Sequence, residues 1–123
     1  MRKILGLLLI ILLSCSLASC KDQETDEVQE ILEKMTLREK AAQMLMPSFS
    51  YASFRSNDIN VPMTALTTEV SQIIEDLGFG GIILFSDNIH DATQTVKLID
   101  ELNAASVKGG HLPLLIGADQ EGG

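Results

Sequence analysis

The fold is decided by the last stretch of the chain, which reads Leu112-Pro113-Leu114-Leu115-Ile116-Gly117-Ala118-Asp119-Gln120-Glu121-Gly122-Gly123. Its first part is almost entirely apolar, and an apolar run of this length is typical of a strand covered on both faces of a parallel sheet. Asp119 and Glu121 follow at the carboxyl end of that strand, where α/β enzymes bind their ligands. No helix follows to complete this unit, so we expect the chain to be part of a longer protein.

Two helices are expected before this stretch. Apolar residues at helical spacing predict one helix from Thr64 to a glycine end at Gly78 and another from an N-cap at Asp91 to Gly109. The apolar residues of these helices are Leu66, Val70, Ile73, Ile74, Leu77, Val96, Leu98, Ile99, Leu102 and Ala105.

Three strands are expected, at 44–48, 82–85 and 113–118. Pro47 argues against a long helix in the first of these segments. The order strand, helix, strand, helix, strand with short connections predicts a parallel sheet with right-handed crossovers. This α/β pattern fits the N-terminal portion of a TIM-like (β/α)8 barrel, incomplete in this chain, and an open doubly wound sheet fits it equally well.

Further elements are predicted at the start of the chain. Helical spacing of apolar residues from Val28 to Met35 predicts a helix, and Thr36 with Glu39 forms a capping-box pattern that begins a second one. The polar segment 51–62 has the composition of a surface loop.

Residues 1–19 have the pattern of a bacterial signal peptide. Arg2 and Lys3 form a basic start, and the apolar stretch that follows is too short to span a bilayer. Leu17-Ala18-Ser19-Cys20 resembles the lipobox, in which the cysteine becomes the lipidated first residue of the mature protein. We expect an exported protein of the bacterial cell envelope, anchored to the membrane by lipid at Cys20. The alternative is an ordinary thiol near a conventional cleavage site.

The mature chain is strongly acidic. Residues 20–27 are acidic and poor in apolar groups, and we interpret them as a tether before a domain over 28–123. Without residues 1–19, seven basic residues face 17 acidic ones, a formal charge of −10, which argues against nucleic acid as a partner. Cys15 lies in the segment to be removed, so no cysteine pair remains for a disulfide or a thiolate metal site.

The candidate site residues follow the second and third predicted strands. They are Ser86-Asp87-Asn88 and Asp119-Gln120-Glu121. An aspartate at such an edge can accept hydrogen bonds from two neighbouring sugar hydroxyls, or it can cap the following turn. Glu121 could act as a general acid or base, but its spacing from Asp119 does not establish a catalytic pair.

The two histidines and the glycine cluster are not candidate sites. His90 and His111 have no second ligand at a metal-binding spacing, so we expect both to be surface or packing residues. Gly78-x-Gly80-Gly81 is followed by a strand instead of a helix, which excludes a dinucleotide fingerprint there.

Three stretches together resemble glycoside hydrolase family 3, particularly its bacterial β-N-acetylhexosaminidase branch. They are Met35-Thr36-Leu37-Arg38-Glu39-Lys40 with Gln43-Met44, Gly80-Gly81-Ile82-Ile83-Leu84-Phe85 with Asn88, and the final stretch from Pro113 to Gly123. The resemblance extends from about Val28 to the end of the chain.

This resemblance implies a TIM-like barrel and an exo-acting, retaining hydrolase without metal or cofactor. The implied reaction removes terminal β-linked N-acetylglucosamine from glycans such as cell-wall fragments. Asp119 matches the family aspartate that binds hydroxyls of the terminal sugar. The family's nucleophile lies on a later strand and its acid/base on a later loop, after a Lys-His-Pro-Gly-type stretch. Neither is found in this sequence, so we expect no catalytic residue and no activity in the isolated chain.

Two other functions stay open at this point. A family 3 β-glucosidase or β-xylosidase would share the early motifs and bind a different set of hydroxyls. A non-catalytic lipoprotein that binds sugars or a partner would need none of the missing residues. We also expect an unclosed barrel to be poorly stable, because it leaves a bare strand edge and an uncovered apolar face.

Overall fold

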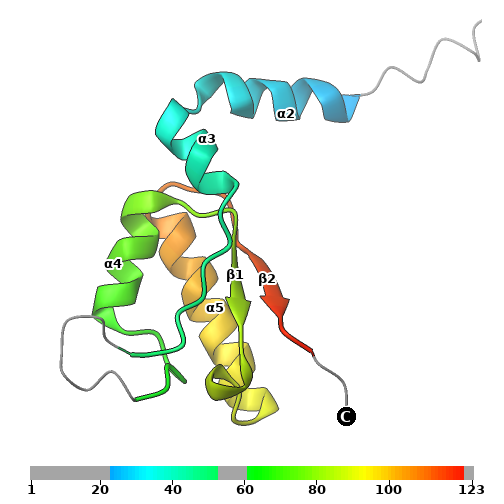
Figure 1. Cartoon of the computed structure of the whole chain (residues 1–123). Coiled ribbons are helices and arrows are strands. Elements are labelled where there is room, and N and C mark those ends of the chain that lie inside the picture. The colour runs from blue at the N-terminus through cyan, green and yellow to red at the C-terminus, as the bar shows by residue number, and fades with distance from the viewer. Residues whose placement is uncertain (1–22, 53–60, 121–123) are drawn as a thin grey trace, which may run out of the picture. The chain divides into compact units, whose positions relative to one another are not determined.

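The computed structural model describes residues 23–52 and 61–120 (Figure 1). The chain divides into two compact units, Met1–Lys34 and Met35–Gly123. Cys20 and the expected signal peptide lie outside the described residues, as does the central part of the predicted surface loop. Within the described residues, no helix combines the length and the apolar character needed to cross a membrane.

Helix α2 (Gln23–Lys34) is the described part of the first unit. It begins inside segment 20–27, which we expected to be a tether, and it includes most of the helix predicted from Val28 to Met35. Contacts one turn apart support the helix, from Gln29 Nε2 to Glu33 Oε1 (2.9 Å) and between Lys34 and Glu30 (3.6 Å). Glu, Gln and Lys are good helix formers, so the polar composition that suggested a tether is equally compatible with a helix.

Helix α3 (Leu37–Gln43) begins at the predicted capping box. The Glu39 backbone N–H donates to Thr36 Oγ1 (3.2 Å), and the Thr36 N–H donates to the Glu39 carboxylate (2.7 Å). These reciprocal bonds satisfy two backbone donors that have no partner within the helix. The predicted helix start is therefore confirmed.

The first expected strand, at 44–48, is wrong as a regular element. Its contribution to the sheet is a single parallel bridge between Ser48 and Ile83. The carbonyls of Leu45 and Pro47 accept from Gly81 N (3.4 Å) and Ile83 N (3.1 Å). Pro47 has no N–H to return, which prevents a full ladder.

The other two strands are confirmed as β1 (Gly81–Leu84) and β2 (Leu115–Ala118). They pair in parallel, with Leu84 opposite Ala118. Figure 1 shows both arrows pointing away from α3, while α5 (Ala92–Lys108) runs back in the opposite direction between them in sequence. Parallel pairing with a helical crossover is the βαβ unit that the sequence predicted.

The expected end of α4 (Thr68–Leu77) at Gly78 and the expected start of α5 at Asp91 are confirmed, whereas α4 begins at Thr68 instead of Thr64. Helix α4 starts at an N-cap on Thr67 and ends at Gly78, which has φ 64°. Helix α5 starts at the Asp91 N-cap, whose carboxylate accepts from Gln94 N (2.9 Å).

The core lies between one face of the two strands and helices α4 and α5. Its largest fully buried apolar side chains are Met63, Val70, Ile74, Ile82, Leu98 and Leu102. Val96, expected on the apolar side of α5, is 59% exposed.

The expectation that the last strand is covered on both faces is wrong for the described residues. Leu115 is 70% exposed, and the neighbouring Met46 is 45% exposed. Covering both faces requires chain on the side of the sheet opposite α4 and α5, where the Met46 side chain lies beside Gly81 and Gly117.

Candidate functional site

The two strands end side by side, so the polar residues after them share one edge of the sheet. The Asp119 backbone N–H donates to the Leu84 carbonyl (3.0 Å), which extends the ladder by one residue beyond β2. Asp119 and Asp87 are exposed at this edge. Among the residues that the structure describes, none donates a hydrogen bond to the Asp119 carboxylate. That carboxylate is therefore free to accept hydrogen bonds from a ligand.

The three residues after β1 have different environments. They form the short 3₁₀ helix η1 (Ser86–Asn88), in which Ser86 and Asp87 are exposed and Asn88 is completely buried. Buried polar groups are normally hydrogen-bonded, and Asn88 makes three such bonds within the protein. Asn88 therefore serves the scaffold, while its two neighbours are available at the edge.

Glu121, the other carboxylate of the final motif, lies outside the described residues. Its separation from Asp119 thus stays a prediction. Gln120, between them, is exposed.

Both histidines are confirmed as surface or packing residues. His90 is exposed and its Nδ1 donates to the Asp91 carboxylate (3.2 Å). The pKa of Asp91 is lowered mainly by the Gln94 backbone N–H and then by His90. His111 is half-buried, and its Nε2 donates to the Glu75 carbonyl (2.9 Å). In the described ranges, no three His, Cys, Asp or Glu side chains gather in a way that could hold a metal.

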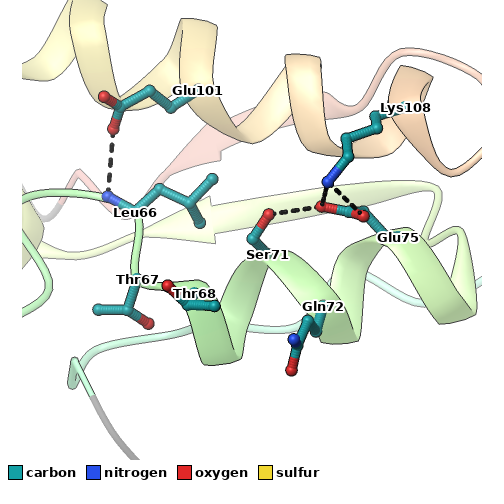
Figure 2. A pocket seen from close by; sticks show the side chains of 8 residues that line it. All are labelled: Leu66, Thr67, Thr68, Ser71, Gln72, Glu75, Glu101 and Lys108. Carbon is teal, nitrogen blue, oxygen red and sulfur yellow. Dashed lines mark hydrogen bonds and ion pairs between the residues drawn. The ribbon is translucent and has the colours of Figure 1, made fainter.

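A separate groove of about 420 Å³ lies between α4 and α5 (Figure 2). Its charged groups already bind one another: the Glu75 carboxylate accepts from Lys108 Nζ (2.9 and 3.0 Å) and from Ser71 Oγ (2.7 Å). Glu101 accepts from the Leu66 N–H (3.2 Å). These contacts join the two helices, and the groove is distinct from the edge that carries Asp119.

Sequence reasoning missed the contacts that build the edge. Gln94 was not among the candidate site residues, yet its side chain donates to the carbonyls of Thr64 and Asn88 and accepts from the His90 N–H. A buried role for Asn88 was also missed. The available signal was an amide residue directly after an apolar strand, which by itself does not distinguish a ligand contact from a scaffold contact.

The fold and the edge define an α/β protein whose polar residues gather at the carboxyl ends of parallel strands, the usual ligand site of α/β enzymes. The chain belongs to glycoside hydrolase family 3: the sequence profile described as Glycosyl hydrolase family 3 N terminal domain matches residues 36–123.

Known relatives agree with this assignment. Beta-hexosaminidase A of Pseudoalteromonas piscicida is 35% identical over 94 residues, which are 72% of this chain and 16% of that protein. A Beta-hexosaminidase of Vibrio cholerae serotype O1 is 41% identical over 58 residues, 47% of this chain and 16% of its own length. The chain thus spans about one sixth of the length of these relatives.

A solved structure confirms the fold class. The glycoside hydrolase family 3 beta-N-acetylglucosaminidase from Paenibacillus sp. str. FPU-7 superimposes with a TM-score of 0.55 at 32% identity, over 72% of this chain and 15% of that one. The fold is the N-terminal part of a TIM-like (β/α)8 barrel, and the alternative of an open doubly wound sheet is set aside.

Proposed function

We propose that the full-length protein is an exo-acting, retaining glycoside hydrolase that removes terminal β-linked N-acetylglucosamine from glycans, including cell-wall fragments. Its relatives carry the names beta-hexosaminidase and beta-N-acetylglucosaminidase. No metal or cofactor takes part in the proposed reaction.

The position of Asp119 carries this proposal. Its carboxylate is exposed directly beyond β2, at the edge where barrel enzymes bind substrates. A carboxylate can accept two hydroxyl hydrogen bonds from one sugar, and hydrogen bonds to charged groups are the stronger class. In this proposal Asp119 binds the terminal sugar, and the nucleophile and the acid/base come from parts of the full-length protein beyond this chain.

The experiment compares hydrolysis of aryl β-N-acetylglucosaminide, β-glucoside and β-xyloside by the full-length protein. We expect the N-acetylglucosaminide to be cleaved with by far the highest kcat/KM. Asp119→Asn should lower that kcat/KM about 10- to 100-fold, because a neutral amide replaces a charged acceptor. Asp76→Asn, an exposed aspartate on α4, is the matched control and should leave kcat/KM unchanged.

Other outcomes would support the alternatives. Preference for the glucoside or xyloside would assign the other branch of the family. Absence of all turnover by the full-length protein would favour a non-catalytic binding lipoprotein. Turnover by the isolated 123-residue chain would contradict the proposal that its catalytic residues lie elsewhere.

The proposal includes export and lipid anchoring at Cys20 in the bacterial cell envelope. The basic start, the short apolar stretch and the lipobox-like Leu17-Ala18-Ser19-Cys20 support it. Labelling with an alkyne fatty acid tests it: Cys20→Ala should abolish incorporation, and Cys15→Ala should not. Incorporation that survives Cys20→Ala would overturn the anchor.

A further inference from the structure

Asn88 is fully buried just beyond the carboxyl end of β1, and the three hydrogen bonds of its side-chain amide go to backbone groups. Its Oδ1 accepts from the Phe85 N–H (3.0 Å), and its Nδ2 donates to the carbonyls of Phe49 (3.0 Å) and Met63 (3.0 Å). This set of partners requires one acceptor and two donors on the same side chain, which among uncharged residues only an amide provides.

The acceptor end of Asn88 is linked to Asp119 through one peptide group. The N–H of Phe85 and the carbonyl of Leu84 belong to the same planar unit. Asn88 Oδ1 accepts from that N–H, and Asp119 N donates to that carbonyl (3.0 Å). The orientation of this peptide plane therefore contributes to the position of the Asp119 backbone, together with the pairing of β2.

The donor end of Asn88 holds a second part of the edge. Phe49 and Met63 lie at the two ends of the connection, residues 49–63, that follows segment 44–48 and precedes α4. The two ends pair with each other through Met63 N to Ser50 O (3.0 Å) and Ala52 N to Val61 O (2.9 Å). Asn88 thus links both ends of connection 49–63 to η1, the turn whose Asn88 side chain also binds the Phe85 N–H.

Gln94 reinforces the same turn from the first turn of α5. Its Nε2 donates to the Asn88 carbonyl (3.1 Å) and to the Thr64 carbonyl, and its Oε1 accepts from the His90 N–H (2.9 Å). The side chains of Asn88 and Gln94 therefore both link η1 to the segment at Met63 and Thr64.

We propose that Asn88 is a positioning residue of the sugar site, which orients Asp119 through the Leu84–Phe85 peptide and holds the segments at Phe49 and Met63 beside it. This inference rests on the proposed function. It assigns to Asn88 an effect on the affinity for the terminal sugar, without contact between Asn88 and the substrate.

The test measures KM and kcat of the full-length protein on an aryl β-N-acetylglucosaminide, together with backbone hydrogen exchange. Asn88→Ala should raise KM at least about fivefold with kcat changed less than about twofold, because a less well positioned Asp119 binds the terminal sugar more weakly while the chemical step is unchanged. Exchange should accelerate in peptides that cover 49–52, 61–64 and 119. If Asn88→Ala does not fold, Gln94→Met provides the same readouts with a smaller change in the same direction.

Asn103→Ala is the matched control. Asn103, on α5, is also an amide that bonds to backbone groups, with Oδ1 accepting from Leu114 N (2.8 Å) and Nδ2 donating to Ile99 O (3.2 Å). Its partner Leu114 directly precedes β2, at the end of that strand opposite to Asp119. Asn103→Ala should lower stability and leave KM unchanged. Equal KM changes in both variants, or an unchanged KM in Asn88→Ala, would overturn the positioning role.

The failure of the proposed function is distinguishable from these results. It is visible in the unsubstituted protein, as absence of turnover. In that case hydrogen exchange still tests whether Asn88 holds the segments at Phe49 and Met63. The proposed effect of Asn88 on sugar affinity is then rejected together with the proposed function.

Discussion

At the residue scale, Gly78 and Gly110 distinguish two costs of adding a side chain: backbone strain and steric overlap with neighbouring atoms. Both have positive φ, 64° and 83°, which an L side chain adopts only with strain. A Cβ on Gly78 would also overlap the imidazole of His111, whereas a Cβ on Gly110 meets no atom within 4 Å. Gly78 therefore carries a packing constraint in addition to its backbone constraint.

We predict that Gly110→Ala costs about 1–2 kcal/mol of unfolding free energy, the strain of the left-handed conformation alone. Gly78→Ala should cost about 2–5 kcal/mol, since overpacking adds to that strain. Urea unfolding of the two variants measures both values. Combining Gly78→Ala with His111→Ala should recover part of the loss, and equal costs for the two glycines would contradict the packing constraint.

At the element scale, one ion pair joins α4 to α5. The pKa of Glu75 is lowered below its ordinary value of 4.5, first by the hydrogen bond from Lys108 and then by that from Ser71. A carboxylate with a lowered folded pKa stabilises the protein above its unfolded pKa, and this contribution is lost as pH falls through the folded pKa. Glu75 therefore makes the packing of the two helices weaker in acid.

We predict that Lys108→Met raises the pKa of Glu75 toward 4.5 and reduces the loss of stability between neutral pH and pH values below 4.5. The measurements are an NMR titration of the Glu75 carboxyl and urea unfolding at each pH. Glu39 and Asp91 also have lowered pKa values, but their partners are unchanged, so the difference isolates Glu75. Lys97→Met, which affects the pair with Glu101, is the control and should leave the Glu75 titration unchanged.

Element boundaries were well predicted from the sequence where the signal is local. The capping residues Thr36 and Asp91 and the terminal glycine Gly78 stand where the pattern placed them, because each acts on backbone groups a few residues away. The first strand was wrong because a strand exists only through pairing, and Pro47 limits the pairing of 44–48.

At the scale of the whole molecule, the described residues of the second unit cover one face of the sheet and leave apolar side chains exposed on the other. A Cβ added to Gly81 would meet both Leu115 and the Met46 side chain, on the side away from α4 and α5. With 70% and 45% of their surfaces exposed, they form an apolar patch next to the edge of β2. Apolar patches beside a free strand edge promote association between chains.

We predict that the isolated 123-residue chain self-associates with increasing concentration in sedimentation velocity. Leu115→Lys should shift the chain toward monomer, because a charge at the patch opposes burial between copies. Val96→Lys, at a 59% exposed position on α5, adds the same charge elsewhere and should have little effect. A monomeric chain with a single cooperative melt would contradict this prediction.

The sequence by itself determined the order of α4, β1, α5 and β2, the parallel βαβ unit and the position of Asp119 at the end of β2. These features depend on periodicity and on caps, which act over one or two turns. Only the tertiary structure decided the role of Asn88, because its partners Phe49 and Met63 are 39 and 25 residues away in the chain. No local pattern records such a contact: whether a polar side chain faces a ligand or the backbone depends on which distant segments fold against it.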